Sequence, residues 1–173
     1  MPVKAVVFDL GGVLIDWDPR YLYRKLLDDE AAVEEFLATV CTPEWNAEQD
    51  RGRPFAEGVA ELVERHPVHA AAITAYHERW PEMLGGTVGG TVEVLAELRA
   101  AGVPVYALTN WSAETFGIAR ERFEFLEWFD GVLVSESGTL TTISWNMAAG
   151  ATASGVLRGD ISGLPVGPGG GDE

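Results

Sequence analysis

The residue best placed for covalent chemistry is Asp9, which follows a short apolar run at residues 3–8 and precedes Gly11 and Gly12. A β-branched run of this length predicts a buried parallel strand, and α/β sheets bind ligands at the carboxyl ends of such strands. A carboxylate there can attack a phosphorus or carbon centre. The glycines let backbone N–H groups approach an anion closely. The alternative for Asp9 is an ordinary turn or capping role.

Thr109 and Asn110 occupy the same place after a second apolar run, residues 103–108. A hydroxyl and an amide can hold phosphoryl or carboxylate oxygens. Because parallel strands bring their carboxyl ends to one edge of a sheet, we expect the two polar strand ends to lie together. The alternative is a strand-end turn before a helix that Ser112 caps.

The elements that must position these residues alternate between strands and helices. A helix is expected from Val92 to a stop at Gly102, another from Ser112 through Ala119, and a third strand at residues 132–134. This alternation predicts right-handed parallel crossovers.

Residues 20–84 have a different pattern, with apolar residues at helical spacing. Pro19 fits the first turn of a helix that Asp18 would cap. A helical block of this length directly after one strand predicts an inserted cap. Residues 85–90, which contain four glycines, predict a hinge-like linker behind it.

Two motifs resemble those of the haloacid dehalogenase superfamily. Residues 8–14, Phe-Asp-Leu-Gly-Gly-Val-Leu, are similar to its first motif, and residues 108–112, Leu-Thr-Asn-Trp-Ser, are similar to its second. The helical block between them resembles the small cap of that superfamily. The segments typical of one bacterial branch of phosphatase-like and dehalogenase-like members are residues 16–25, 44–46 and 79–80.

The resemblance covers residues 3–135 and implies an α/β fold. Its core would be a Rossmann-like parallel sheet, truncated after the third strand, with an inserted helical cap. The expected divisions are a core at 1–15 and 86–138, a cap at 16–85, and an atypical, partly disordered tail at 139–173.

The same resemblance implies that Asp9 is the nucleophile and forms an aspartyl-phosphate. Mg²⁺ would be held by Asp9 and the backbone carbonyl of Gly11. The residues expected to bind the transferring group are Leu10, Gly11, Gly12, Thr109 and Asn110. Arg20 could bind a substrate carboxylate or phosphate from the cap entrance, and its alternative is a solvated ion pair.

The chain departs from the family pattern in three places. Phosphatase members usually carry a second aspartate two positions after the nucleophile as general acid and base, but Gly11 stands there and has no proton to give. Both lysines, Lys4 and Lys25, precede the second motif, so the family's third-motif lysine is not found. The fourth-motif acidic pair is not found either, and Asp160 is a conceivable replacement as a metal ligand.

Three functions therefore stay open. The first, which is our leading expectation, is phosphomonoester hydrolysis with Mg²⁺ through an aspartyl-phosphate on Asp9. The second is 2-haloacid dehalogenation, in which Asp9 displaces halide through an aspartyl-ester and no metal is needed. The third is a truncated or frame-shifted, catalytically incomplete member of the family, which the missing motifs favour.

The lack of a fourth strand predicts that residues 3–8 form an exposed, aggregation-prone sheet edge. Residues 132–135 and 139–145 would pair as a hairpin at the opposite edge. Pairing of two copies along the exposed strand would make a homo-oligomer.

Composition limits the partners. The chain has 12 Lys and Arg against 27 Asp and Glu, a net charge of −15, which argues against nucleic acid and anionic membranes as partners. Its apolar runs fall short of the roughly 18–20 residues of a bilayer span. Cys41 is the only cysteine, so an intrachain disulfide is not expected. We expect a cytoplasmic protein that acts on a small phosphorylated or halogenated acid.

Overall fold

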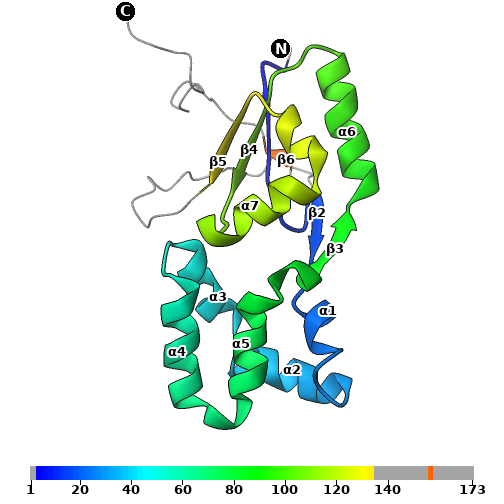
Figure 1. Ribbon diagram of the computed structural model, residues 1–173. Coiled ribbons are helices and arrows are strands. Elements are labelled where there is room, and N and C mark those ends of the chain that lie inside the picture. Colours follow the sequence, from blue (N-terminus) through cyan, green and yellow to red (C-terminus); the bar gives the residue numbers. More distant parts are fainter. Residues whose placement is uncertain (1–2, 135–155, 158–173) are drawn as a thin grey trace, which may run out of the picture.

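The computed structural model describes residues 3–134 and 156–157 of the 173-residue chain (Figure 1). Its main sheet has the strand order β5–β4–β1–β6. Three of these strands run parallel, and β6 is antiparallel to β1. The strands are β1 (Val6–Phe8), β4 (Val105–Thr109), β5 (Gly131–Val134) and β6 (Val156–Leu157). The expected α/β fold with three parallel strands is thus confirmed.

The inner strand β1 is buried along its whole length, with Val6, Val7 and Phe8 each less than 5% exposed. Strands covered on both faces carry continuous apolar runs, which explains the pattern of residues 3–8. The crossovers between the parallel strands contain α6 (Gly89–Ala100) and α7 (Ala113–Arg122).

The ends of both crossover helices follow the expected signals. After α6, Gly102 adopts a φ of 69°, which glycine reaches without steric cost. At the start of α7, Ser112 Oγ accepts a hydrogen bond of 3.3 Å from the backbone N–H of Glu114. This cap fixes where the chain leaves β4 and turns into the helix.

The helices of residues 20–83 lie together beyond the end of the sheet (Figure 1) and share an aromatic core. Phe55 stacks on Tyr76 with ring centroids 6.2 Å apart, and Trp45 meets Tyr76 edge-on at 5.0 Å. The α-helices are α1 (Arg20–Tyr23), α2 (Glu30–Thr39), α3 (Pro43–Asp50), α4 (Phe55–Arg65) and α5 (Ala70–Glu78). The 3₁₀ helices of the described residues are η1 (Pro67–His69), η2 (Trp80–Met83) and, after α7, η3 (Glu124–Trp128). None of the helices in the described part has the length and apolar character needed to cross a membrane.

An antiparallel ribbon carries the chain into and out of these helices. It pairs β2 (Ile15–Trp17) with β3 (Leu84–Thr87). Residues 85–90 therefore differ from the expected linker, because they belong to β3 and the first turn of α6. The expected core and cap boundaries fall within this ribbon, and the division into two domains stays a prediction.

Gly85 is a point where the ribbon leaves no room for a side chain. A Cβ atom there would overlap the Asp16 carboxylate, which accepts a hydrogen bond of 2.7 Å from the Tyr21 hydroxyl. We expect Gly85→Ala to lower the free energy of unfolding by about 1–3 kcal/mol, because Asp16 must move and lose this bond. Urea unfolding measures the effect.

Gly90 provides the matched control for this substitution. A Cβ atom at Gly90 meets nothing within 4 Å, and the residue lies in α6. Gly90→Ala should leave stability unchanged or raise it by up to about 1 kcal/mol. Equal stability of the Gly85 and Gly90 variants would contradict the packing argument.

The expectation of an exposed first strand is wrong. β6 covers the outer edge of β1, with Val7 opposite Leu157 and Phe8 opposite Val156. A two-residue strand among glycines and serines has too little apolar pattern to predict, and its partner lies about 150 residues earlier. The hairpin strand expected at 139–145 lies outside the described residues, as does the rest of the tail apart from β6. A homo-oligomer stays a prediction.

Candidate active site

The Asp9 side chain lies half-buried at the carboxyl end of β1. Its Oδ1 accepts a hydrogen bond of 2.7 Å from the backbone N–H of Leu10. Burial raises the pKa of Asp9, and the hydrogen bonds from Leu10 and from the Thr109 side chain lower it in part. Thr109 ends the neighbouring strand β4 and is 3% exposed. The structure thus brings these two predicted site residues into contact.

A tight turn follows Asp9 and directs the chain into β2. The Leu10 carbonyl accepts the backbone N–H groups of Leu14 and Ile15, both at 2.9 Å. Gly12 adopts a φ of 72°, a conformation that favours glycine, and donates its N–H to the Ile15 carbonyl at 2.8 Å. This turn places Gly11 against the site.

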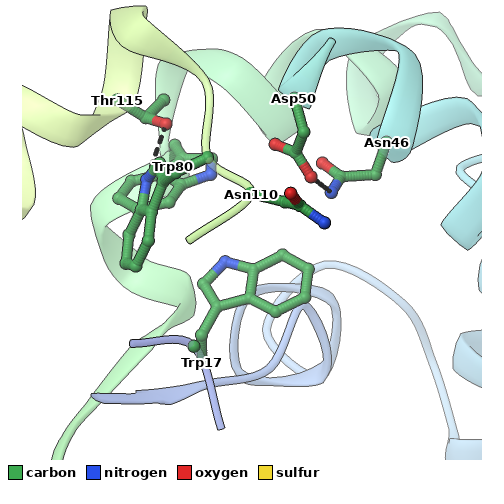
Figure 2. A pocket seen from close by; sticks show the side chains of 8 residues that line it. Trp17, Asn46, Asp50, Trp80, Asn110 and Thr115 are labelled. Atoms are coloured by element: carbon green, nitrogen blue, oxygen red, sulfur yellow. Dashed lines mark hydrogen bonds between the residues drawn. The ribbon is translucent and has the colours of Figure 1, made fainter. Parts of the chain in front are cut away.

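A pocket of about 100 Å³, here called the site pocket, lies between the strand ends and the helices (Figure 2). Gly11 and Asn110 enter it from the loops after β1 and β4, whereas Asn46 and Asp50 come from α3. Its lining residues are Gly11, Trp17, Asn46, Asp50, Trp80, Asn110, Trp111 and Thr115. The loops that follow β1 and β4 thus meet in one pocket, as expected for the ends of parallel strands.

Asp50 is a pocket residue that the sequence analysis missed. Asn46 Nδ2 donates a hydrogen bond of 3.0 Å to its carboxylate (Figure 2). The Tyr76 hydroxyl in turn donates to Asn46 Oδ1 at 2.8 Å. Burial raises the pKa of Asp50 to about 6, although the Ser112 backbone and the Arg51 charge act to lower it. The available signal was the i,i+4 spacing of Asn46 and Asp50 on one helix face.

Trp17 directs a polar atom toward the site pocket (Figure 2). Its indole Nε1 is buried and has no hydrogen-bond partner among the described residues. A buried N–H without a partner is rare in native proteins, so a ligand oxygen is a suitable acceptor for it. Two further tryptophans, Trp80 and Trp111, also line the pocket.

Arg20 lies beside the site pocket and not in its lining. It forms ion pairs with Glu34 at 2.5 Å and with Asp18 at 3.3 Å. These pairs agree with the alternative given for Arg20, a solvated ion pair. Arg20 also lines a second pocket of about 520 Å³, here called the adjoining pocket, which shares Trp17 and Asn46 with the first. A substrate role for Arg20 stays a prediction.

The described residues bring little positive charge to Asp9. Lys25 pairs with Glu82 at 2.7 Å, and Lys4 is exposed before β1. Among the described residues, no positively charged side chain contributes to the pKa of Asp9. A reaction of Asp9 with an anionic substrate therefore needs a positive charge from a group other than these side chains.

The described residues contain no cluster of three His, Cys, Asp or Glu side chains suited to a metal. Mg²⁺ is nevertheless held in many phosphate sites by one or two carboxylates, substrate oxygens and several waters. The Asp9 carboxylate belongs to that minimal set, and the Gly11 carbonyl stays a predicted second ligand. Asp160, the other predicted ligand, lies outside the described residues.

A family model of haloacid dehalogenase-like hydrolases matches residues 3–143. The chain belongs to this family. The match includes both motifs and the whole helical block between them. The expected resemblance is confirmed, and the hydrolase fold accounts for the meeting of Asp9 with Thr109.

Individual relatives agree with the family. A sesquiterpene phosphatase, astK of Aspergillus oryzae, is 29% identical over 133 residues, which cover 76% of this chain. The chain spans only 64% of that relative's length. The HAD family enzyme bt-2542 of Bacteroides thetaiotaomicron matches with a TM-score of 0.55 at 20% identity, over 80% of this chain and 73% of that one. A structure of the same enzyme with magnesium and inorganic phosphate matches with a TM-score of 0.51 at 21% identity, over 78% of this chain and 69% of that one.

Proposed function

We propose that this hydrolase is a phosphomonoester phosphatase that acts through an aspartyl-phosphate on Asp9. The observation that carries the proposal is the contact of Asp9 with Thr109 at the strand ends, with Asn110 in the pocket beside them. A carboxylate nucleophile next to hydroxyl and amide donors suits transfer of a phosphoryl group. The sesquiterpene phosphatase relative supports phosphatase chemistry over dehalogenation.

In this proposal each strand-end residue has a separate task. Asp9 attacks phosphorus with one carboxylate oxygen, while the Leu10 N–H keeps the other in place. The Asn110 amide and the unpartnered Trp17 indole N–H donate to oxygens of the substrate. These donors stabilise negative charge that develops on the phosphoryl group in the transition state.

The proposed cofactor is Mg²⁺, held by the Asp9 carboxylate and the Gly11 carbonyl. When bound, Mg²⁺ would supply the positive charge that offsets the repulsion between an anionic phosphate and Asp9. The positive charge of Mg²⁺ matters more here than in a site with a lysine, because no cationic side chain of the described residues acts on Asp9.

The proposed substrates are phosphate esters with a partly apolar organic group. Trp17, Trp80 and Trp111 give the site pocket apolar walls. The adjoining pocket of about 520 Å³ offers Leu37, Cys41 and Tyr76 to a longer group. The name of the sesquiterpene phosphatase relative is in line with an apolar substrate.

The experiment that tests this function is phosphate release by the purified chain from a panel of alkyl and aryl phosphates, with 2-chloropropionate beside them. We expect phosphate release with Mg²⁺ and a loss of at least about 100-fold after chelation with EDTA, restored by added Mg²⁺. Halide release without added metal, and no phosphate release, would support the dehalogenase alternative. A folded protein that releases neither would support the catalytically incomplete alternative.

A further inference from the structure

The site lacks an acid at the position two residues after Asp9, where Gly11 stands. An ester oxygen expelled from phosphorus needs a proton unless it is a stable anion. Asp50 is the carboxylic acid that lines the same pocket as Gly11 within the described residues. We propose that Asp50 is the general acid and base of this site, an inference that rests on the proposed phosphatase function.

Asp50 is held in place from two sides. On the helical side, Asn46 donates to its carboxylate at 3.0 Å and is itself fixed by the Tyr76 hydroxyl at 2.8 Å. On the sheet side, the backbone of Ser112, two residues after Asn110, lies close enough to Asp50 to lower the pKa of its carboxyl group. The carboxylate therefore spans from α3 to the strand-end loop that carries the proposed phosphate donors.

Further contacts fix α4 and α5 against the start of α7. Glu114 Oε1 accepts the backbone N–H of Phe55 at 2.9 Å, and Glu114 Oε2 lies 3.5 Å from His77 Nε2. Phe55 begins α4, which follows α3 by a short turn. These contacts keep the helix that carries Asp50 close to the strand ends, so its carboxyl group stays in the pocket.

The protonation behaviour of Asp50 suits this role. Burial raises its pKa to about 6, which leaves a protonated fraction near neutral pH. Asp50 also makes no ion pair of 4 Å or less with the described residues, so no direct ion pair fixes it in the charged form. Efficient acid–base catalysts have a pKa near the working pH.

The two proposed steps balance. In the first, an Asp9 oxygen bonds to phosphorus, the bond from phosphorus to the ester oxygen breaks, and protonated Asp50 gives its proton to that oxygen. The organic product leaves as an alcohol. In the second, a water oxygen bonds to phosphorus, the bond to Asp9 breaks, and the Asp50 carboxylate takes the water proton. Inorganic phosphate leaves, and both side chains return to their first states.

The test compares Asp50→Asn with the wild type on two esters. Hexyl phosphate needs a proton on its leaving oxygen, whereas 4-nitrophenyl phosphate expels a stable anion. We expect kcat/KM for hexyl phosphate to fall by about 10²–10⁴-fold, and that for 4-nitrophenyl phosphate to fall by less than about tenfold. Equal losses on the two esters, or no loss on either, would overturn the role of Asp50.

Two controls separate the possible failures. Glu64→Gln, an exposed change on the neighbouring helix α4, should leave both rates unchanged. Wild-type chain that releases phosphate from neither ester would overturn the proposed function and this inference with it. Because the pKa of Asp50 is raised on folding, its charge destabilises the fold above pH 6, so the neutral asparagine should not lower Tm at pH 7.5.

A pH profile of the wild type tests the same role without a variant. Above pH 6 the protonated form of Asp50 declines, so kcat/KM for hexyl phosphate should fall about tenfold per pH unit and that for 4-nitrophenyl phosphate should not. The other titratable groups that act on Asp50 are Arg51, a permanent cation, and Tyr76, whose pKa burial raises. Parallel profiles for the two esters would contradict the proposal.

Discussion

Replacement of Asp9 by asparagine is expected to lower kcat for 4-nitrophenyl phosphate by about 10⁴–10⁶-fold, the size of effect seen when a covalent nucleophile is removed. An amide cannot form the acyl phosphate, so the whole two-step route is lost. Steady-state phosphate release by matched preparations measures this loss.

The fold should survive this substitution. The asparagine carbonyl oxygen can still accept the backbone N–H of Leu10, which Asp9 Oδ1 accepts at 2.7 Å. Because burial raises the pKa of Asp9, the charged form costs stability above its folded pKa, and this cost lessens as pH falls. Asp9→Asn should therefore keep or raise Tm at pH 7. A folded variant that retains more than about 1% of wild-type kcat would contradict a nucleophilic Asp9.

The second large effect is expected at Asn110. Asn110→Ala removes an amide that lines the site pocket and should lower kcat/KM by about 10²–10³-fold on both phosphate esters, as for other donors to a developing anion. The side chain is exposed, so Tm should change little. Initial rates on hexyl and 4-nitrophenyl phosphate test whether the loss is uniform.

Asn110→Asp separates this binding role from a turn role. Aspartate forms strand-end turns as readily as asparagine, but its carboxylate would repel an incoming phosphate. If Asn110 binds the phosphoryl group, Asn110→Asp should lose at least as much activity as Asn110→Ala. Wild-type activity in Asn110→Asp would show that the residue only shapes the turn.

Much of the fold could be predicted because its signals are local. The β-branched run before Asp9 marks a buried strand, and the Ser112 cap and Gly102 stop bound the two crossover helices. The β2–β3 ribbon was not predicted, since its strands lie about 70 residues apart and residues 85–90 are rich in turn-forming glycine. Strand β6 was missed for the same reason, as a two-residue pairing is decided by tertiary contact alone.

The candidate site also contains residues that the sequence could predict and one that it could not. Asp9 and Asn110 follow strands and Thr109 ends one, so their meeting could be predicted from sheet geometry alone. Asp50 sits at the end of a helix that looks polar and solvated in sequence, and its burial depends on how α3 packs against the loop before α7. A side chain whose environment comes from two distant segments carries no local signal of its role.

The central claim, a phosphoryl group carried by Asp9, is tested most directly by trapping. Wild-type chain quenched with borohydride during turnover of 4-nitrophenyl phosphate should yield homoserine at position 9, because hydride reduces the acyl phosphate and releases phosphate. Asp9→Asn treated alike should yield none. Turnover at full rate with an unreduced Asp9, or reduction at a different aspartate, would contradict the account.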